Sequence, residues 1–164
     1  ATIMGIMYLG VPMFSLAMMP MLLTSDYVWN GLAFLMFLFL VWGNDVFAYL
    51  VGITCGRHKM CERLSPKKSW EGFIGGVLGS VAVGAVAASV LDGDYLKWMI
   101  LAVIVSLASV LGDLVESMFK RDAGVKDSGN IMPGHGGMLD RFDALLVAAP
   151  FAFVFVLVYV SIAN

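Results

Sequence analysis

The sequence has 164 residues, of which 60% are hydrophobic and 13% are charged, and its mean hydropathy is +0.90. Ordinary soluble domains are about 45–50% apolar and about 25% charged, so this composition excludes a soluble domain and indicates an integral membrane protein. The length fits a single domain, residues 1–164, and the formal net charge of −2 says little about partners.

Five segments are long and apolar enough to cross a membrane as helices, which takes about 20 residues for about 30 Å of hydrocarbon. They are residues 2–23, 28–53, 72–91, 97–119 and 138–163. The predicted fold is therefore an all-α, polytopic bundle of about five transmembrane helices, with two loops that carry the chemistry.

Two of these segments have features that bear on packing. The second is aromatic in its first half and is then interrupted by the polar pair Asn44 and Asp45. The third carries glycines at small-xxx-small spacing, in the pairs Gly72 with Gly76 and Gly75 with Gly79. This spacing predicts close packing of helix backbones rather than ligand binding.

Positively charged residues gather in two of the four connections between the segments. The connections after the second and fourth segments are basic, whereas the other two hold Asp26, Asp92, Asp94 and the single Lys97. Cytoplasmic loops of membrane proteins carry an excess of Lys and Arg. We therefore expect both basic loops and the N-terminus in the cytoplasm, and the C-terminus outside.

The stretch richest in charge is residues 113–143, which holds half of the acidic residues of the chain. Within the fourth segment, Asp113, Glu116, Ser117 and Lys120 follow at i, i+3, i+4 and i+7, a spacing that places them on one face of a helix. Carboxylates at membrane depth are costly, which favours a functional role. Oxygen ligands of this kind suit a hard cation such as Mg²⁺.

Asp140 and Asp143 form a second acidic pair, at i and i+3 near the start of the fifth segment. Mg²⁺ is usually bound by one or two carboxylates together with substrate phosphates, so neither acidic pair needs to be a complete cage. The alternative is an acidic cluster that is paired internally with Lys and Arg.

The loop between the fourth and fifth segments combines basic side chains with glycines. Lys120, Arg121 and Lys126 precede Gly134-His135-Gly136-Gly137, which lies directly before the fifth segment. Glycines let the backbone approach an anion, and a helix N-terminus offers free N–H groups. We therefore predict phosphate binding in this loop, whereas His135 lacks the Cys or His neighbours of a zinc site.

The other basic loop contains Ser65, Lys67, Lys68, Ser69 and the interfacial Trp70. Two interpretations remain open at this point. The residues form an ordinary positively charged cytoplasmic loop, or they are ligands for a phosphate or a lipid headgroup on the same side as the first loop.

Together these residues resemble the signature of CDP-diacylglycerol synthases, also called phosphatidate cytidylyltransferases. The motifs are Ser117-x-x-Lys120-Arg121, Lys126-Asp127, and His135-Gly136-Gly137-x-x-Asp140-Arg141-x-Asp143. The loop at residues 65–72 and the stretch Gly112-Asp113-x-x-Glu116-Ser117 look like further motifs of that family. Its members are usually longer, so we expect this chain to be the C-terminal, catalytic part of one, without the N-terminal membrane helices.

The resemblance implies transfer of CMP from CTP to phosphatidate, giving CDP-diacylglycerol and pyrophosphate with a divalent cation such as Mg²⁺. It implies a multi-pass protein of a bacterial inner membrane, with the catalytic loops in the cytoplasm. The expected partners are CTP, phosphatidate and membrane lipids, with a homodimer as an open alternative to a monomer. No nucleic-acid partner is expected.

The motifs and the resemblance also assign roles to residues. We predict Asp113 and Asp140 as the first metal ligands, and Glu116 and Asp143 as the next candidates. The residues expected at the phosphates of CTP are Lys120, Arg121, Lys126 and His135, followed by Gly136 and Gly137. Asp127 is a further catalytic candidate. The residues expected to bind the phosphatidate headgroup are Ser65, Lys67, Lys68 and Arg141. Ser69 and Ser117 are expected as further substrate-binding residues.

Two other functions remain open from the sequence. One is a related CTP-using enzyme that acts on another membrane lipid, a polyprenol kinase or an ether-lipid cytidylyltransferase, which its product would distinguish. The other is an ion-coupled transporter, which predicts carboxylates near the middle of the membrane. The charges collect toward the ends of the apolar segments instead, which counts against a transporter.

Overall fold

The computed structural model describes residues 2–24, 26–61, 65–122, 124 and 139–163. Helices make up most of this part of the chain, and a short hairpin of two strands joins the second helix to the third. In chain order the elements are α1 (Thr2–Leu23), α2 (Gly31–Cys55), β1 (Lys59–Cys61), β2 (Ser65–Ser69), α3 (Trp70–Val90), α4 (Tyr95–Asp122) and α5 (Leu139–Ala163).

The prediction of an all-α membrane bundle is confirmed. Five of the described helices are long and apolar enough to cross a membrane, and their ends differ from the predicted ends by only a few residues. The helix α2 begins after Asn30, whose side chain accepts hydrogen bonds from the backbone N–H groups of Leu32 and Ala33. The polar pair Asn44 and Asp45 lies within α2, which continues as a helix through both residues, as the predicted second segment does.

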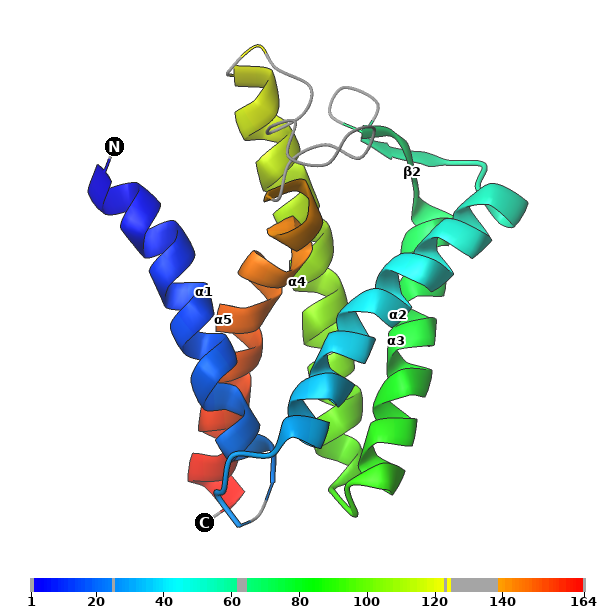
Figure 1. Cartoon of the computed structure of the whole chain (residues 1–164). Helices are drawn as coiled ribbons and strands as arrows, with labels where there is room; N and C mark the ends of the chain where they lie inside the picture. Colours follow the sequence, from blue (N-terminus) through cyan, green and yellow to red (C-terminus); the bar gives the residue numbers. More distant parts are fainter. Residues whose placement is uncertain (1, 25, 62–64, 123, 125–138, 164) are drawn as a thin grey trace.

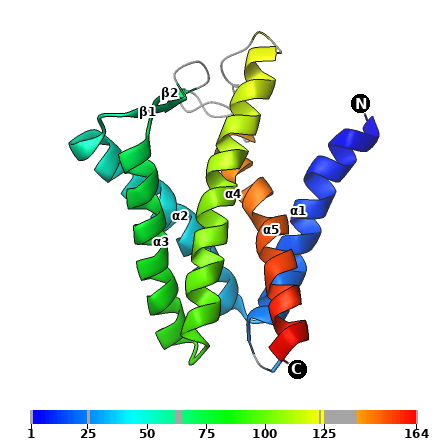
Figure 2. The ribbon, with the colours of Figure 1, turned by 180° about the vertical axis from the view of Figure 1, so that it is seen from behind.

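The helices are arranged around α4, which packs against α3 on one side and α5 on the other (Figure 1). Of the remaining two helices, α2 packs mainly against α3 and also contacts α4, and α1 packs against α5 (Figure 2). The hairpin, the N-terminus of α1 and the last turns of α4 lie at the same end of the bundle, which we call the hairpin end. With 28 residues, α4 is about 42 Å long.

Glycines bring α3 into close contact with α2, as their spacing predicted. A Cβ atom added to Gly72 would lie 2.8 Å from the carbonyl oxygen of Ala48, and one added to Gly76 would lie 2.9 Å from that of Asn44. One added to Gly75 would lie 2.5 Å from a methyl group of Val51. Side chains at these positions would force the helices apart, so the prediction of close backbone packing is confirmed.

The hairpin was not predicted, since the sequence analysis treated residues 65–72 as a loop. Strands β1 and β2 pair antiparallel, with Lys59 opposite Ser69. The carboxylate of Glu71 holds the entry to the hairpin, because it accepts hydrogen bonds from the backbone N–H groups of Arg57 and His58, each at 3.2 Å. The ring of His58 contacts the same carboxylate at 2.6 Å. Contacts between residues 13 or 14 positions apart thus fix this segment.

Candidate active site

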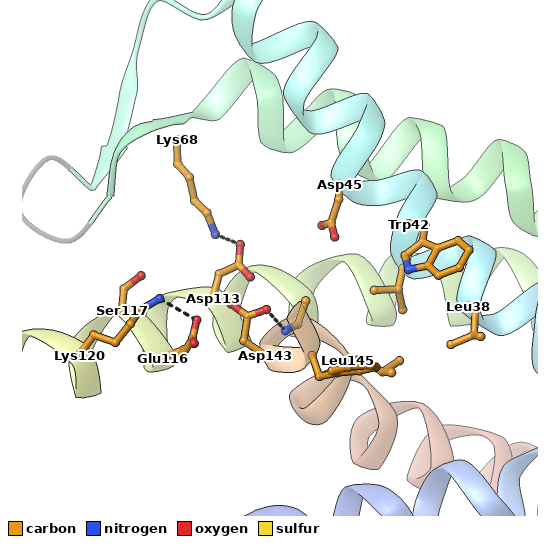
Figure 3. Close-up of a pocket in the computed structure, with 13 residues that line it drawn as sticks. Leu38, Trp42, Asp45, Lys68, Asp113, Glu116, Ser117, Lys120, Asp143 and Leu145 are labelled. Atoms are coloured by element: carbon orange, nitrogen blue, oxygen red, sulfur yellow. Dashed lines mark hydrogen bonds and ion pairs between the residues drawn. The ribbon is translucent and has the colours of Figure 1, made fainter. Parts of the chain in front are cut away.

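The polar residues gather around one cavity of about 420 Å³ at the hairpin end, where α2, α4 and α5 meet. We call it the acidic cavity. Its apolar wall comes mainly from α2 and α5, and its polar lining faces the same space from several elements (Figure 3). The polar and charged residues of this lining are Asp45, Lys68, Asp113, Glu116, Ser117, Lys120 and Asp143.

The predicted polar face of the fourth segment is confirmed, because Asp113, Glu116, Ser117 and Lys120 all line the acidic cavity. Glu116 is only 2% exposed. One of its carboxylate oxygens accepts a hydrogen bond from the ammonium group of Lys120 at 3.0 Å. The other oxygen is buried without a hydrogen-bond partner in the described part of the chain, and buried polar atoms of this kind call for a ligand or a water.

A glycine explains why α5 comes close enough to complete the cavity. A Cβ atom added to Gly112 would lie 2.7 Å from the backbone carbonyl oxygen of Asp143, so only a residue without a side chain fits there. The carboxylate of Asp143 accepts a hydrogen bond from the backbone N–H of Ala144 at 2.7 Å. Of the two acidic pairs predicted on separate segments, both members of the first and Asp143 of the second therefore line one cavity.

The first basic loop also reaches the cavity. The ammonium group of Lys68, the residue before the N-cap of α3, donates a hydrogen bond to Asp113 at 2.5 Å (Figure 3). The two side chains are 25% and 32% exposed, so the ion pair is accessible. The alternative of an internally paired acidic cluster thus holds in part, because Asp113 and Glu116 each have a lysine partner.

Asp45 is a site residue that the sequence analysis noted only as a polar interruption. It lies on α2 and lines the acidic cavity together with Lys68 and Asp113. The signal for it was present, because a carboxylate inside a membrane-spanning helix is by default a functional residue. Its spacing from the other acidic residues gave no indication that α2 would bring it to the same place.

A second cavity, of about 510 Å³, also borders the Lys68–Asp113 ion pair. It is lined by α2, the hairpin, the start of α3 and α4, and it shares Asp45, Lys68 and Asp113 with the acidic cavity. Asn44 also lines it, is 2% exposed, and has a side-chain oxygen without a hydrogen-bond partner among the described residues. The ion pair therefore stands at the junction of two cavities.

Comparison with known proteins shows the family of the chain. A sequence model of the cytidylyltransferase family matches residues 1–159. The chain belongs to the cytidylyltransferase family. It is 47% identical over 124 residues to the phosphatidate cytidylyltransferase of Staphylococcus saprophyticus. The aligned region covers 74% of this chain and 48% of that protein.

Two other relatives match the chain with similar identity and coverage. The phosphatidate cytidylyltransferase of Staphylococcus epidermidis is 48% identical over 124 residues, again 74% of this chain and 48% of the relative. That of Synechocystis sp. is 44% identical over 126 residues, 76% of this chain and 43% of the relative. The chain spans about half the length of the curated relatives it matches. The predicted resemblance to this family is confirmed.

Side chains outside the described part of the chain, whose roles stay predictions, are those of Ser65, Lys67, Lys126, Asp127, His135, Asp140 and Arg141, together with residues Gly136 and Gly137. Of the remaining predicted residues, Arg121 is exposed at the end of α4. The hydroxyl oxygen of Ser69 accepts a hydrogen bond from the backbone N–H of Gly72 at 3.2 Å and caps α3.

The donor set of the acidic cavity fits a divalent metal ion that shares its ligands with a substrate. Within the residues that the structure describes, no group of three or more His, Cys, Asp or Glu side chains is placed to hold an ion alone. Asp113, Glu116 and Asp143 nevertheless supply carboxylate oxygens to one cavity, and one oxygen of Glu116 is unpartnered. Mg²⁺ is commonly bound by one or two carboxylates with phosphate oxygens and waters completing its shell.

Proposed function

We propose that this chain carries out transfer of CMP from CTP to phosphatidate, with release of pyrophosphate and formation of CDP-diacylglycerol. The observation that supports this most is the acidic cavity, in which carboxylates from three helices lie beside Lys68 and Lys120 within a membrane bundle. The names of the bacterial relatives point the same way. Acidic groups can hold a cation and basic groups can bind phosphates, so this combination suits a reaction between two polyanions that needs a cation.

The apolar wall of the cavity favours a lipid as the acceptor. Leu38 and Trp42 from α2 lie opposite Leu145 from α5 (Figure 3), and Trp42 is 55% exposed on the outside of the bundle. The cavity therefore offers charged groups at one part and apolar groups at another, as an amphipathic molecule with an anionic headgroup requires. A water-soluble acceptor would gain nothing from this wall.

The reaction needs little proton chemistry from the protein. An oxygen of the phosphatidate phosphate attacks the α-phosphorus of CTP, and the bond from that phosphorus to the bridging oxygen breaks as pyrophosphate leaves. Because the attacking oxygen is already an anion, no strong general base is required. Lys120 and Lys68 supply positive charge and orientation where the phosphates meet, so that catalysis consists of positioning and electrostatic stabilisation.

For the metal ion we propose Asp113 and Asp140 as ligands, with Glu116 and Asp143 as further candidates. When bound, a divalent ion supplies positive charge to the triphosphate and stabilises the charge of the leaving pyrophosphate. The carboxylates hold that charge at the depth of the lipid headgroup. We also propose that the hairpin end faces the cytoplasm of a bacterial cell, since Lys68, Lys120 and Arg121 lie at this end.

The test is incubation of the purified, detergent-solubilised protein with labelled CTP, phosphatidate and Mg²⁺. We expect CDP-diacylglycerol and pyrophosphate in equal amounts, and loss of both when EDTA is added. A phosphorylated lipid alcohol together with CDP would show a kinase instead. No nucleotide transfer to phosphatidate by folded protein would refute the proposal.

A further inference from the structure

The ion pair between Lys68 and Asp113 differs from the other lysine–carboxylate contact of the acidic cavity. Lys120 and Glu116 belong to the same helix, at i and i+4, and the Glu116 side chain is 3% exposed. Lys68 instead reaches α4 from the end of β2, and both members of its pair are partly exposed. A partly exposed ion pair contributes little to stability, so a competing cation can break it without unfolding the site.

The position of the pair gives the ammonium group two places to go. Lys68 and Asp113 line both cavities, and so does Asp45, which offers a second carboxylate at the junction. The lysine side chain is a compact point charge on a flexible stem of four carbons. A change of its rotamer alone can therefore move the charge from Asp113 toward an anion in either cavity, without movement of the hairpin backbone.

Lys68 and a divalent ion compete for Asp113. The ammonium group lies 2.5 Å from one oxygen of this carboxylate, whereas Mg²⁺ binds carboxylate oxygens at about 2.0–2.1 Å. Two cations on one carboxylate would lie within a few ångströms of each other and repel strongly in a partly desolvated site. Binding of the metal at Asp113 is therefore linked to departure of Lys68.

We propose that Lys68 is an internal cation which holds the place of the metal at Asp113, and that metal binding releases it to bind the phosphate of the lipid substrate. The part of the proposal that concerns competition with a metal ion is argued from the Lys68–Asp113 ion pair alone. The identity of the anion as a lipid phosphate rests on the proposed function. In this arrangement the metal ion and the lipid promote each other's binding, because each is favoured by the conformation in which Lys68 has left Asp113.

The first experiment measures binding of Mn²⁺ alone, by electron paramagnetic resonance, to the purified protein in detergent. Lys68→Gln removes the competing charge, so we expect Mn²⁺ to bind about fivefold more tightly or better, the lower range of typical coupling between sites. Arg57→Gln, just before the same hairpin, is the matched control, because Arg57 is exposed and lines neither cavity, and it should leave the Mn²⁺ affinity unchanged. An affinity that is unchanged or weaker in folded Lys68→Gln would overturn the proposal.

The second experiment adds phosphatidate in dodecyl maltoside micelles, with phosphatidylcholine in the same micelles as the lipid control. In the unmodified protein, phosphatidate should tighten Mn²⁺ binding and phosphatidylcholine should not. In Lys68→Gln this coupling should be lost. Coupling that survives in Lys68→Gln would show direct contact between metal and phosphate, and would overturn the role of Lys68.

These results separate the inference from the proposed function. Tighter Mn²⁺ binding by Lys68→Gln, together with no CDP-diacylglycerol from the unmodified protein, would refute the proposed function and retain the competition. Native elution and an unchanged melting temperature establish that Lys68→Gln is folded. If this variant does not fold, the unmodified protein decides, because absence of coupling between Mn²⁺ and phosphatidate would overturn the proposal.

Discussion

Replacement of Gly76 by alanine tests whether the contact between α2 and α3 positions the site. The added Cβ would lie 2.9 Å from the backbone carbonyl oxygen of Asn44 and 3.0 Å from the Cβ of Ala48. A carbonyl oxygen cannot rotate away as a flexible side chain can, so the two helices must separate locally. Asn44 directly precedes Asp45, and the displacement therefore reaches a residue of the acidic cavity.

The expected cost follows from two opposing effects. Overpacking of a well-packed contact costs about 1–3 kcal/mol, whereas alanine is favoured over glycine in a helix by about 1 kcal/mol. Because the clash at Gly76 includes a backbone atom, we take the upper part of the overpacking range, about 2–3 kcal/mol, and expect Gly76→Ala to lower the free energy of unfolding by about 1–2 kcal/mol. CMP transfer should fall as well, because the carboxylate of Asp45 moves with α2.

Unfolding by SDS, followed by tryptophan fluorescence of the detergent-solubilised protein, measures this free energy. Gly10→Ala in α1 is the matched control, because a Cβ added there meets nothing within 4 Å. It should leave the protein as stable as before or slightly more stable. The reasoning is refuted if Gly76→Ala is as stable as the unmodified protein, or if both variants lose stability equally.

Three further predictions follow from the site and the bundle. Asp113→Asn should lower CMP transfer about ten- to a hundredfold, the cost of one charge-assisted contact, with unchanged thermal stability; full activity at low Mg²⁺ would exclude Asp113 as a ligand. In a cysteine-free background, a cysteine at Lys59 should react with a membrane-impermeant reagent only from the cytoplasm and one at Asp92 only from outside, and labelling from the reverse sides would invert the topology. The hydroxyl of Tyr159 donates a hydrogen bond to Asp94, which lowers the pKa of that carboxyl below its ordinary value. Its stabilisation is therefore present at neutral pH and lost as the pH falls through the lowered pKa, so melting temperatures of the unmodified protein and Tyr159→Phe should differ at pH 7 and converge in acid.

The helices could be predicted from the sequence because a membrane-spanning segment needs only length and apolar composition. The bounds of α1 agree with the prediction, but α2 begins three residues later than predicted, at Gly31. The cause is local: the side chain of Asn30 accepts the backbone N–H groups that follow it, and average hydropathy does not detect a helix cap. The hairpin escaped prediction because its ends are fixed by the contact of Glu71 with His58, which lies 13 residues away.

The site was predictable as far as one helix determines it. The spacing of Asp113, Glu116, Ser117 and Lys120 is a property of α4 alone, and all four share a cavity. The place of Asp45 depends instead on how α2 crosses α4, which no local pattern records. The approach of α5 depends on Gly112, where the absence of a side chain leaves room for the backbone of α5. The sequence shows the glycine but not which helix packs against it.

The length of α4 relates the position of Asp113 to the thickness of the bilayer. Asp113 follows the first residue of this helix, Tyr95, by 18 positions, or about 27 Å along the axis, while the hydrocarbon core is about 30 Å thick. A helix that starts at one face of the hydrocarbon core and runs along the membrane normal therefore carries Asp113 close to the opposite face, near the depth of the lipid phosphates. A membrane thicker by a few ångströms would move those phosphates away from Asp113 unless the helix became more upright or the lipid thinned around it. Membrane thickness, which no residue encodes, would therefore affect how closely Asp113 approaches the phosphate of a membrane lipid.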